Sequence, residues 1–314
     1  MEISSLWRTA QSFDGTTSSA GQQWIDEMEL LILLGIGLTI GGVALALDED
    51  DDGTTQAEET VSPDAPDTLP VTSGSTITTS DGDDDFTASN QDETIFLRDG
   101  NDLAEGRGGD DRLFGGDGED VLVGGEGNDF LRGGADDDTL VDNAGSDTIH
   151  GDGGNDLIFA TTAVDGEGIV EFSRGVIDGR ITDFSELNQY YTPSTDTDEQ
   201  ADEIFAGAGD DTVFAGDGDT VTLGDGNDIL GVGDWVVSSH DPVIVTDFNP
   251  SEDVLVYSHD NEGPLPNLSV NHLSGGEGEA LLFADNVLVA RLPGVGGDFT
   301  IGDVSIVERA DNVI

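Results

Sequence analysis

The sequence predicts an all-β protein built around a parallel β-roll, a solenoid of short stacked strands. Residues 79–159 repeat every nine residues, nine times without a gap, and a run at 197–240 returns to the same period. An acid and an apolar residue keep fixed positions in each copy, and glycine holds the fourth position in seven of the nine, as in 115–123 (GGDGEDVLV) and 124–132 (GGEGNDFLR). A strict short period indicates an architecture in which each repeat is one structural unit.

The apolar residue stands at the eighth position of each copy and the acid at the sixth. The last three residues are expected to form a short strand, whose middle side chain points to one face. Two copies would make one 18-residue coil and place copies i and i+2 directly above each other. We therefore expect a buried line of eighth-position side chains and a column of carboxylates along each edge. The eighth positions are Phe86, Ile95, Ala104, Leu113, Leu122, Leu131, Leu140, Ile149 and Ile158, and the sixth are Asp84, Glu93, Asp102, Asp111, Asp120, Asp129, Asp138, Asp147 and Asp156.

The first six residues of a copy must turn a corner, and glycine supplies the positive φ angles that such a turn needs. Carboxylates and exposed backbone carbonyls are the ligands that Ca²⁺ prefers. The sequence therefore predicts several calcium ions between successive turns. The predicted ligands are Asp84, Asp102, Asp111, Gly115, Gly116, Asp117, Gly118, Asp120, Gly124, Gly125, Gly127, Asp129, Gly133, Asp138, Asp147, Gly151 and Asp156, with Asp202, Asp211, Asp219 and Asp228 in the second run.

These copies resemble the hemolysin-type nonapeptide repeats of the RTX (repeats in toxin) family, with the motif Gly-Gly-x-Gly-x-Asp-x-apolar-x, over about a third of the chain. The stretch 79–159 has 23 acids and four arginines, a net charge of −19. Seven Ca²⁺ ions, the most that nine copies paired i with i+2 can hold, would reduce this to −5. Because like charges repel, we expect the calcium-free repeats to be unfolded and metal binding to be coupled to folding.

The whole chain has a formal charge of −59, its nine basic residues are all arginine, and it has no cysteine. Such an acidic chain lacks the basic surface that nucleic-acid binding requires, and it is not suited to anionic membrane surfaces. Adaptation to high salt is a second explanation of the charge and stays open here. The lack of cysteine excludes disulfides and thiol catalysis, and it is typical of the RTX family.

Three segments precede the repeats. Residues 1–27 are polar, and 28–47 contain an uncharged stretch from Leu30 to Leu47 that is long enough for a transmembrane helix. A signal-like segment or a buried segment are the alternatives for 28–47. Residues 48–78 form an acidic linker rich in threonine and proline. We expect one hydrophobic helix that tethers the protein to a membrane.

After the first repeats, 160–196 is expected to be a β-hairpin insert, and the second run at 197–240 either continues the same roll or stacks on it. Residues 241–314 alternate as strands, with a turn at Asp285-Asn286, and predict an antiparallel β cap over the open end of the roll. The last four residues resemble the C-terminal signal of type I secretion, a route that conflicts with an N-terminal anchor. That conflict stays open.

No enzyme is predicted. The four histidines lie outside any His-Glu-x-x-His motif, and the chain has no Gly-x-Ser-x-Gly element. The sequence instead indicates a calcium-binding protein that is exported or tethered at the cell surface and folds outside the cell. Alternatives are an adhesion module that binds a surface protein or polysaccharide through 160–196, and a calcium buffer or secretion passenger without a partner.

Overall fold

The computed structural model describes residues 74–162, 168, 170, 200–236, 242–260, 264–273, 278–297 and 299–309. The chain divides into two compact units, Met1–Ala46 and Leu47–Ile314, and every described residue belongs to the second. The predicted hydrophobic helix at 28–47 and almost all of the predicted insert at 160–196 lie outside the described residues. Among the residues that are described, no helix has both the length and the apolar character to cross a membrane.

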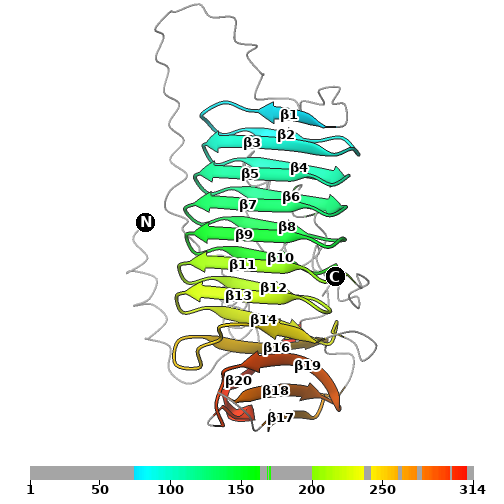
Figure 1. Ribbon diagram of the computed structural model, residues 1–314, viewed down its shortest axis with the longest axis vertical. Helices are drawn as coiled ribbons and strands as arrows, with labels where there is room; N and C mark the ends of the chain where they lie inside the picture. The colour runs from blue at the N-terminus through cyan, green and yellow to red at the C-terminus, as the bar shows by residue number, and fades with distance from the viewer. Residues whose placement is uncertain are drawn as a thin grey trace, which may run out of the picture. The chain divides into compact units, whose positions relative to one another are not determined.

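Two sheets of mostly parallel strands face each other, and the chain alternates between them (Figure 1). The first sheet contains β1 (Ser75–Thr78), β3 (Glu93–Asp99), β5 (Arg112–Asp117), β7 (Phe130–Ala135), β9 (Thr148–Gly153), β11 (Glu203–Ala208), β13 (Thr220–Asp225), β15 (Val243–Val245), β19 (Val287–Pro293), β18 (Glu279–Ala284) and β17 (Leu268–Leu273), in that spatial order. The second contains β2 (Asp85–Thr87), β4 (Leu103–Gly108), β6 (Val121–Glu126), β8 (Thr139–Asp142), β10 (Leu157–Ala160), β12 (Thr212–Ala215), β14 (Ile229–Gly233), β16 (Val254–Asp260) and β20 (Val304–Arg309).

The pairing register confirms that two repeats make one coil. Leu113 on β5 pairs with Ile95 on one side and with Leu131 on the other, the eighth positions two repeats before and two repeats after it. Most strands are longer than the three residues expected from the motif, because they continue into the first three positions of the next repeat. The turn is therefore confined to positions four to six. In the six-residue strands the register omits the first position of the repeat, as at Gly115, where Phe114 and Gly116 are paired but the residue between them is not. At the shorter strand β8, by contrast, the first-position Asp142 is paired with Ala160.

The eighth-position side chains form the core, as predicted. Leu113, Leu122, Leu131, Leu140 and Ile149 are completely buried between the two sheets. First-position side chains also point inward, and Leu97 and Ala206 are fully buried there. A glycine at the first position therefore leaves interior space beside the turn that follows it.

The second run continues the same roll. Ile149 on β9 pairs with Ile204 on β11, and Ile158 on β10 pairs with Val213 on β12. The sequence offset between neighbouring coils is 55 here, whereas it is 18 in the first run. The excess over a regular coil equals the length of 163–199. The next coil is one residue short, because the offset from Asp202 to Asp219 is 17. The irregular copy at 215–222 thus shortens the coil without breaking the stack.

The boundary of the predicted cap needs a correction. Residues 243–257 do not belong to an antiparallel cap, because β15 pairs in parallel with β13 and β16 pairs in parallel with β14. The roll therefore extends by one further coil. Among the described strands, antiparallel pairing is restricted to β17, β18 and β19, with the β18–β19 hairpin turning at Asp285 and Asn286, which both have positive φ. These strands extend the first sheet at the far end of the stack (Figure 1), and β20 extends the second sheet in parallel with β16.

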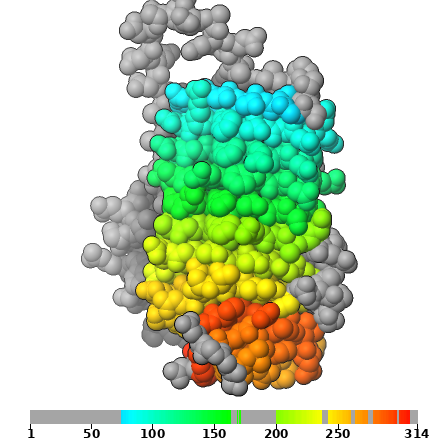
Figure 2. All heavy atoms as spheres, viewed as in Figure 1, coloured from blue at the N-terminus to red at the C-terminus, as the bar shows by residue number. Residues whose placement is uncertain are grey.

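Side chains also stack on the outer face of the first sheet. Phe96, Phe114, Phe130, His150 and Phe205 come from five successive strands, and their ring centroids lie 4.7 to 5.5 Å apart. In the space-filling view the coils follow one another as bands from the cyan β1 to the yellow β16 (Figure 2). These ring contacts between neighbouring strands add to the contacts that hold successive coils together.

Candidate metal centre

The sixth-position acids form two columns, one at each edge of the roll, as predicted. In each column a carboxylate Oδ1 accepts a hydrogen bond from the backbone N–H of the acid one coil earlier. Asp102 N lies 2.9 Å from Asp120 Oδ1, and Asp120 N lies 2.8 Å from Asp138 Oδ1. One column runs through Asp84, Asp102, Asp120, Asp138, Asp156, Asp211, Asp228 and Asp253, and the other through Glu93, Asp111, Asp129, Asp147, Asp202 and Asp219.

The second carboxylate oxygen of eight interior acids has no donor among the described residues. These residues are almost completely buried, with exposed fractions of 3% or less, and the described part of the chain offers their Oδ2 atoms no hydrogen-bond partner. A buried charged oxygen without a partner carries a large desolvation cost. A row of such atoms therefore indicates that a ligand outside the protein completes the turns. The acids with this property are Asp102, Asp111, Asp120, Asp129, Asp138, Asp156, Asp211 and Asp228.

The first-position glycines provide the space and a second type of oxygen. A Cβ placed on Gly106 would lie 2.7 Å from Asp111 Oδ2 and 2.6 Å from the carbonyl oxygen of Gly124 in the next coil. A Cβ on Gly115 would likewise meet Asp120 Oδ2 and the carbonyl oxygen of Gly133. Carboxylate and carbonyl oxygens thus converge where any larger side chain would intrude. This is the donor set of a hard cation such as Ca²⁺.

Burial changes the proton affinity of these acids. It raises the pKa of Asp102, Asp111 and Asp120 to about 7, although the backbone hydrogen bond to each carboxylate acts in the opposite direction. Burial raises the pKa of Asp138 further, to about 9, and the charges of Asp120 and Asp156 add to the shift. Without a cation, the buried carboxylates therefore bind protons far more readily than free aspartate does.

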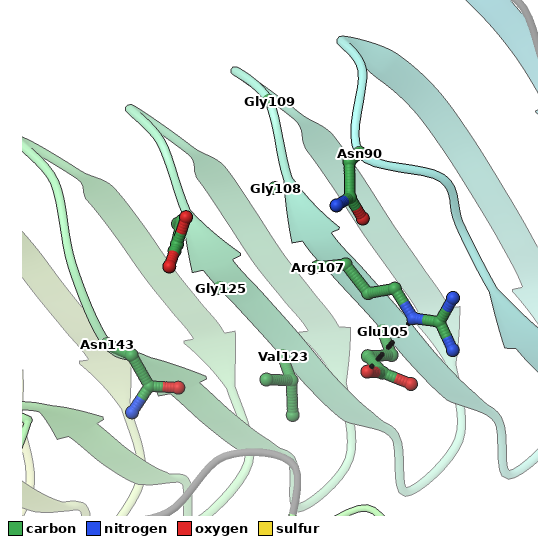
Figure 3. Close-up of a pocket in the computed structure, with 9 residues that line it drawn as sticks. Asn90, Glu105, Arg107, Gly108, Gly109, Val123, Gly125 and Asn143 are labelled. Atoms are coloured by element: carbon green, nitrogen blue, oxygen red, sulfur yellow. Dashed lines mark hydrogen bonds and ion pairs between the residues drawn. The ribbon is translucent and has the colours of Figure 1, made fainter.

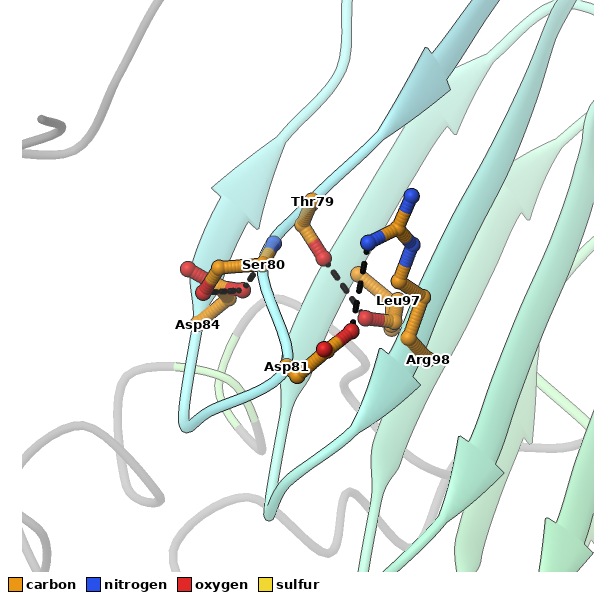
Figure 4. Close-up of polar contacts among 6 residues, drawn as sticks. All are labelled: Thr79, Ser80, Asp81, Asp84, Leu97 and Arg98. Carbon is orange, nitrogen blue, oxygen red and sulfur yellow. Dashed lines mark hydrogen bonds and ion pairs between the residues drawn. The ribbon is translucent and has the colours of Figure 1, made fainter. Parts of the chain in front are cut away.

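The ends of both columns are completed by the protein itself. At the first turn, Ser80 donates its backbone N–H and its hydroxyl to Asp84 Oδ2, both at 2.9 Å (Figure 4). Ser89 donates to the two oxygens of Glu93 in the same way, at 3.3 and 2.7 Å. At the other end, Asn249 N donates to Asp253 Oδ2 at 2.7 Å. Asp84 was predicted as a ligand, and this structure places it at a turn that has protein donors.

A second ladder, which the motif leaves unspecified, runs through the fifth position. Here the side chain of one coil accepts from the backbone of the next, as in Asn128 N to Asp110 Oδ1 at 2.9 Å and Asn155 N to Asp137 Oδ1 at 2.7 Å. In the sixth-position ladder the backbone N–H of the earlier coil donates instead, so each turn is hydrogen-bonded to both the coil before it and the coil after it. The only sequence sign of this ladder is the frequent Asn or Asp directly before the acid, as in Asn128-Asp129.

Sequence reasoning missed other acids in the turns. Asp253 closes the first column, and its signal was an acid two residues before the apolar Leu255, as in the repeats. Asp142 is fully buried at a first position that glycine holds in other copies, and it lies close to Asp129 and Asp147. Asp117, which was predicted as a ligand, is exposed at the third position, and its carbonyl accepts from Gly100 N.

The remaining predicted glycines lie where a side chain would contact the neighbouring backbone or a carboxylate. Gly116, Gly118, Gly125 and Gly127 have positive φ and lie against the backbone of the preceding coil. Gly124, Gly133 and Gly151 lie at first positions against the carboxylates of Asp129, Asp138 and Asp156. In the second run, Asp202 and Asp219 are buried members of the second column, and Asp219 Oδ2 accepts from Gly216 N at 2.6 Å.

An open groove over β4 and β6 lies outside the two columns (Figure 3). Arg107 and Glu105 face each other there, with Nε 3.3 Å from Oε1, and Asn90 and Asn143 line the same groove. The ion pair neutralises Glu105. The groove therefore does not share the buried, donor-free carboxylates of the turns.

Comparison with protein families agrees with this geometry. Residues 72–104, 98–131, 105–140, 132–162 and 196–230 match the RTX calcium-binding nonapeptide repeat. These residues are RTX repeats. The matched stretches cover the coils that carry the donor-free carboxylates, and the RTX repeats bind calcium as a class.

No curated protein matches the sequence. Among solved structures, the chain is similar to the extracellular lipase LipA of Serratia marcescens, with 16% identity and a TM-score of 0.19. The similarity covers 76% of this chain and 40% of the lipase chain. It is too distant to assign a function.

Proposed function

We propose that the RTX roll binds several Ca²⁺ ions along its two carboxylate columns and that binding drives the roll to fold. The observation that carries this proposal is the row of buried Oδ2 atoms without donors. Each ion would take a carboxylate oxygen and a first-position carbonyl from the next coil, as at Gly106, Asp111 and Gly124. Ca²⁺ would supply the positive charge that the turns lack.

Burial also separates this proposal from salt adaptation. Acids that serve salt tolerance hold water and ions at the surface, whereas Asp120 and Asp129 are only 1% and 3% exposed. Monovalent ions at high concentration would screen the exposed acids but would leave the desolvated carboxylates without oxygen-coordinated charge. Specific divalent binding therefore accounts for the turns better than a general salt effect.

We further propose that folding takes place outside the cell. Extracellular calcium-binding modules bind calcium at about 10⁻⁴ to 10⁻³ M, a concentration that cytosol does not reach. The chain would stay unfolded before export and fold where calcium is abundant. Membrane attachment through 28–47 and a protein or polysaccharide partner at 160–196 remain predictions from the sequence. The proposed function includes no catalytic step.

The test is a calcium titration of the full chain followed by far-UV circular dichroism, with magnesium and with sodium chloride at matched ionic strength as controls. We expect a steep gain of β signal at roughly millimolar calcium and none with either control. A chain that is already folded in chelator and does not respond to calcium would contradict the proposal. A response of equal size to sodium chloride would favour salt adaptation instead.

A further inference from the structure

One repeat carries an acid at its first position. Asp142 begins the copy 142–150, where Gly106, Gly115, Gly124 and Gly133 hold the same position in other copies. First-position side chains point into the roll, and Asp142 is accordingly 1% exposed. The charge therefore lies in the interior space that the glycines leave empty.

Asp142 meets an acid of the second column across one coil. A Cβ on Gly124 would lie 2.7 Å from Asp142 Oδ1 and 2.7 Å from Asp129 Oδ2, so both carboxylates converge over the same glycine. Asp147, one coil above Asp129, completes the group. One oxygen from each of the three acids lies within 4.8 Å of the other two, and all three residues are buried.

The hydrogen bonds at this turn leave oxygens that point to a cation. Asp129 Oδ1 accepts from Asp111 N at 2.7 Å, but Asp129 Oδ2 has no donor among the described residues and Asp129 is only 3% exposed. Asp142 Oδ1 accepts from Asn143 N at 2.9 Å and from Gly125 N at 3.4 Å, while no donor reaches its Oδ2. None of the ion pairs formed by the described residues includes Asp129 or Asp142.

We propose that Asp129, Asp142 and Asp147 form a three-carboxylate cation site that binds Ca²⁺ more tightly than the other turns of the roll. The other turns combine sixth-position carboxylates with first-position carbonyls, whereas this turn adds a third charge. Calcium affinity rises with the number of charged ligands. This site would fill first and would order the middle of the roll before the ends. The inference rests on the proposed function, because it compares this turn with other calcium sites of the same roll.

The third charge also has a cost without calcium. Three buried carboxylates so close together repel one another strongly in a low-dielectric interior. Removal of the Asp142 charge should therefore stabilise the calcium-free roll and weaken calcium binding at the same time. An acid with only a structural role, through its bonds to Asn143 N and Gly125 N, would change both properties in the same direction.

The experiment uses the full chain and measures Ca²⁺ binding by competition with a calibrated fluorescent chelator. Asp142→Asn keeps an oxygen acceptor and removes the charge, and Asp142→Gly restores the first-position residue of the other copies. The control is Asp99→Asn, which makes the same charge change at an exposed acid that is not among the predicted ligands. In the unmodified chain we expect one ion held at least about tenfold more tightly than the rest. Both Asp142 variants should lose that ion and keep the others, and the control should keep all of them.

A second readout is the folded fraction by circular dichroism, measured in chelator across a titration with the stabilising osmolyte trimethylamine N-oxide, and in saturating calcium across a urea titration. The Asp142 variants should be at least as stable as the unmodified chain in chelator, and less stable than it in saturating calcium. A tight ion that persists in both variants, or an unmodified chain whose ions form one uniform affinity class, would overturn the inference while leaving the proposed function intact. If Asp142→Asn does not fold in calcium, Asp142→Gly decides the outcome. Absence of any calcium binding by the unmodified chain would refute the proposed function itself.

Discussion

At the scale of single residues, the two oxygens of each sixth-position aspartate have different tasks. Oδ1 holds the preceding coil through a backbone N–H, as Asp120 Oδ1 does with Asp102 N. Oδ2 of eight interior acids, such as Asp120, has no donor within the described turns. The same side chain thus provides both a structural hydrogen bond and a metal ligand, which explains why asparagine or serine does not replace it along the interior of the columns.

The first prediction concerns Asp120. Asp120→Ala removes the acceptor of Asp102 N and one proposed ligand, and a lost buried partner costs about 1 to 3 kcal/mol. Urea unfolding in saturating calcium should show a destabilisation of this size. Asp99→Ala, at an exposed acid outside the predicted ligands, should stay within about 0.5 kcal/mol of the unmodified chain. Equal effects of the two substitutions would contradict the assignment of Asp120.

The second prediction concerns pH. Burial raises the pKa of Asp102 to about 7, of Asp211 to about 8 and of Asp138 to about 9, whereas unfolded aspartate titrates near 4. The folded state therefore binds more protons than the unfolded state between these values. Its calcium-free stability is fully present below about pH 4 and is lost as pH rises through about 7 to 9.

Circular dichroism in chelator should accordingly show more β structure at pH 5 than at pH 8. Calcium affinity should depend on pH in the opposite way. Because protons compete with the ion for the same carboxylates, the affinity should fall as pH falls from 8 to 5. Calcium-free stability that increases with pH over this range would show that the carboxylates are not buried as described.

At the scale of single elements, the six-residue strand followed by a three-residue turn is the unit of construction. The turn is tight because glycines at the first positions leave space for the carboxylate, and this space is specific to the position. Gly133 lies against the Asp138 carboxylate, whereas a Cβ on Gly153 would meet no atom within 4 Å. The two glycines therefore offer a matched comparison within one chain.

The third prediction uses this pair. Gly133→Ala would push a methyl group against Asp138 and displace its Oδ2, and such overpacking typically costs about 1 to 3 kcal/mol. The calcium concentration at the folding midpoint should rise for Gly133→Ala and remain unchanged for Gly153→Ala. The measurement is the calcium titration by circular dichroism. A shift of the same size in both variants would mean that backbone flexibility, and not the metal turn, is affected.

Much of this element could be predicted from the sequence, and some of it could not. The inward eighth position and the coil of two repeats follow from the period, and the registers of Leu113 and Leu131 confirm both. The length of the strands was underestimated, because glycines at positions one and two were assigned to the turn although they continue the strand. The serine caps at Asp84 and Glu93 were also missed, since serine at a second position has no distinctive period.

At the scale of the whole described unit, two neighbouring coils of the roll pair normally although a long insertion separates them in the sequence. Residues 163–199 connect β10 to β11, and the strands on either side of this segment remain in register. The stack therefore does not depend on chain continuity through this segment. Contacts between neighbouring coils are sufficient to align them, as in other repeat architectures.

The fourth prediction follows directly. Deletion of 163–199 reduces the sequence offset at this junction from 55 to 18, the value of a regular coil. No linker is required, because five residues would then separate Ala160 from Glu203, as five separate Asp142 from Thr148. The deletion variant should fold at the same calcium concentration as the full chain in a circular dichroism titration.

The same variant addresses the predicted partner. If the insertion contacts a surface protein or polysaccharide, cell binding should disappear on deletion while calcium-dependent folding persists. Loss of folding would show instead that 163–199 is part of the roll. Unchanged cell binding would remove the adhesion alternative for this segment.

The sequence by itself determined the properties that depend on local period: the all-β roll, the buried eighth positions and the two acidic columns. A nine-residue repeat has one coil geometry that places equivalent residues in line, so these features need no knowledge of distant contacts. Only the tertiary structure decided which acids have donors and which do not, that β15 and β16 extend the roll, and that Asp142 joins Asp129 and Asp147. Those outcomes depend on which residues the stacking of coils brings together, and the local pattern does not specify which side chains of different coils meet.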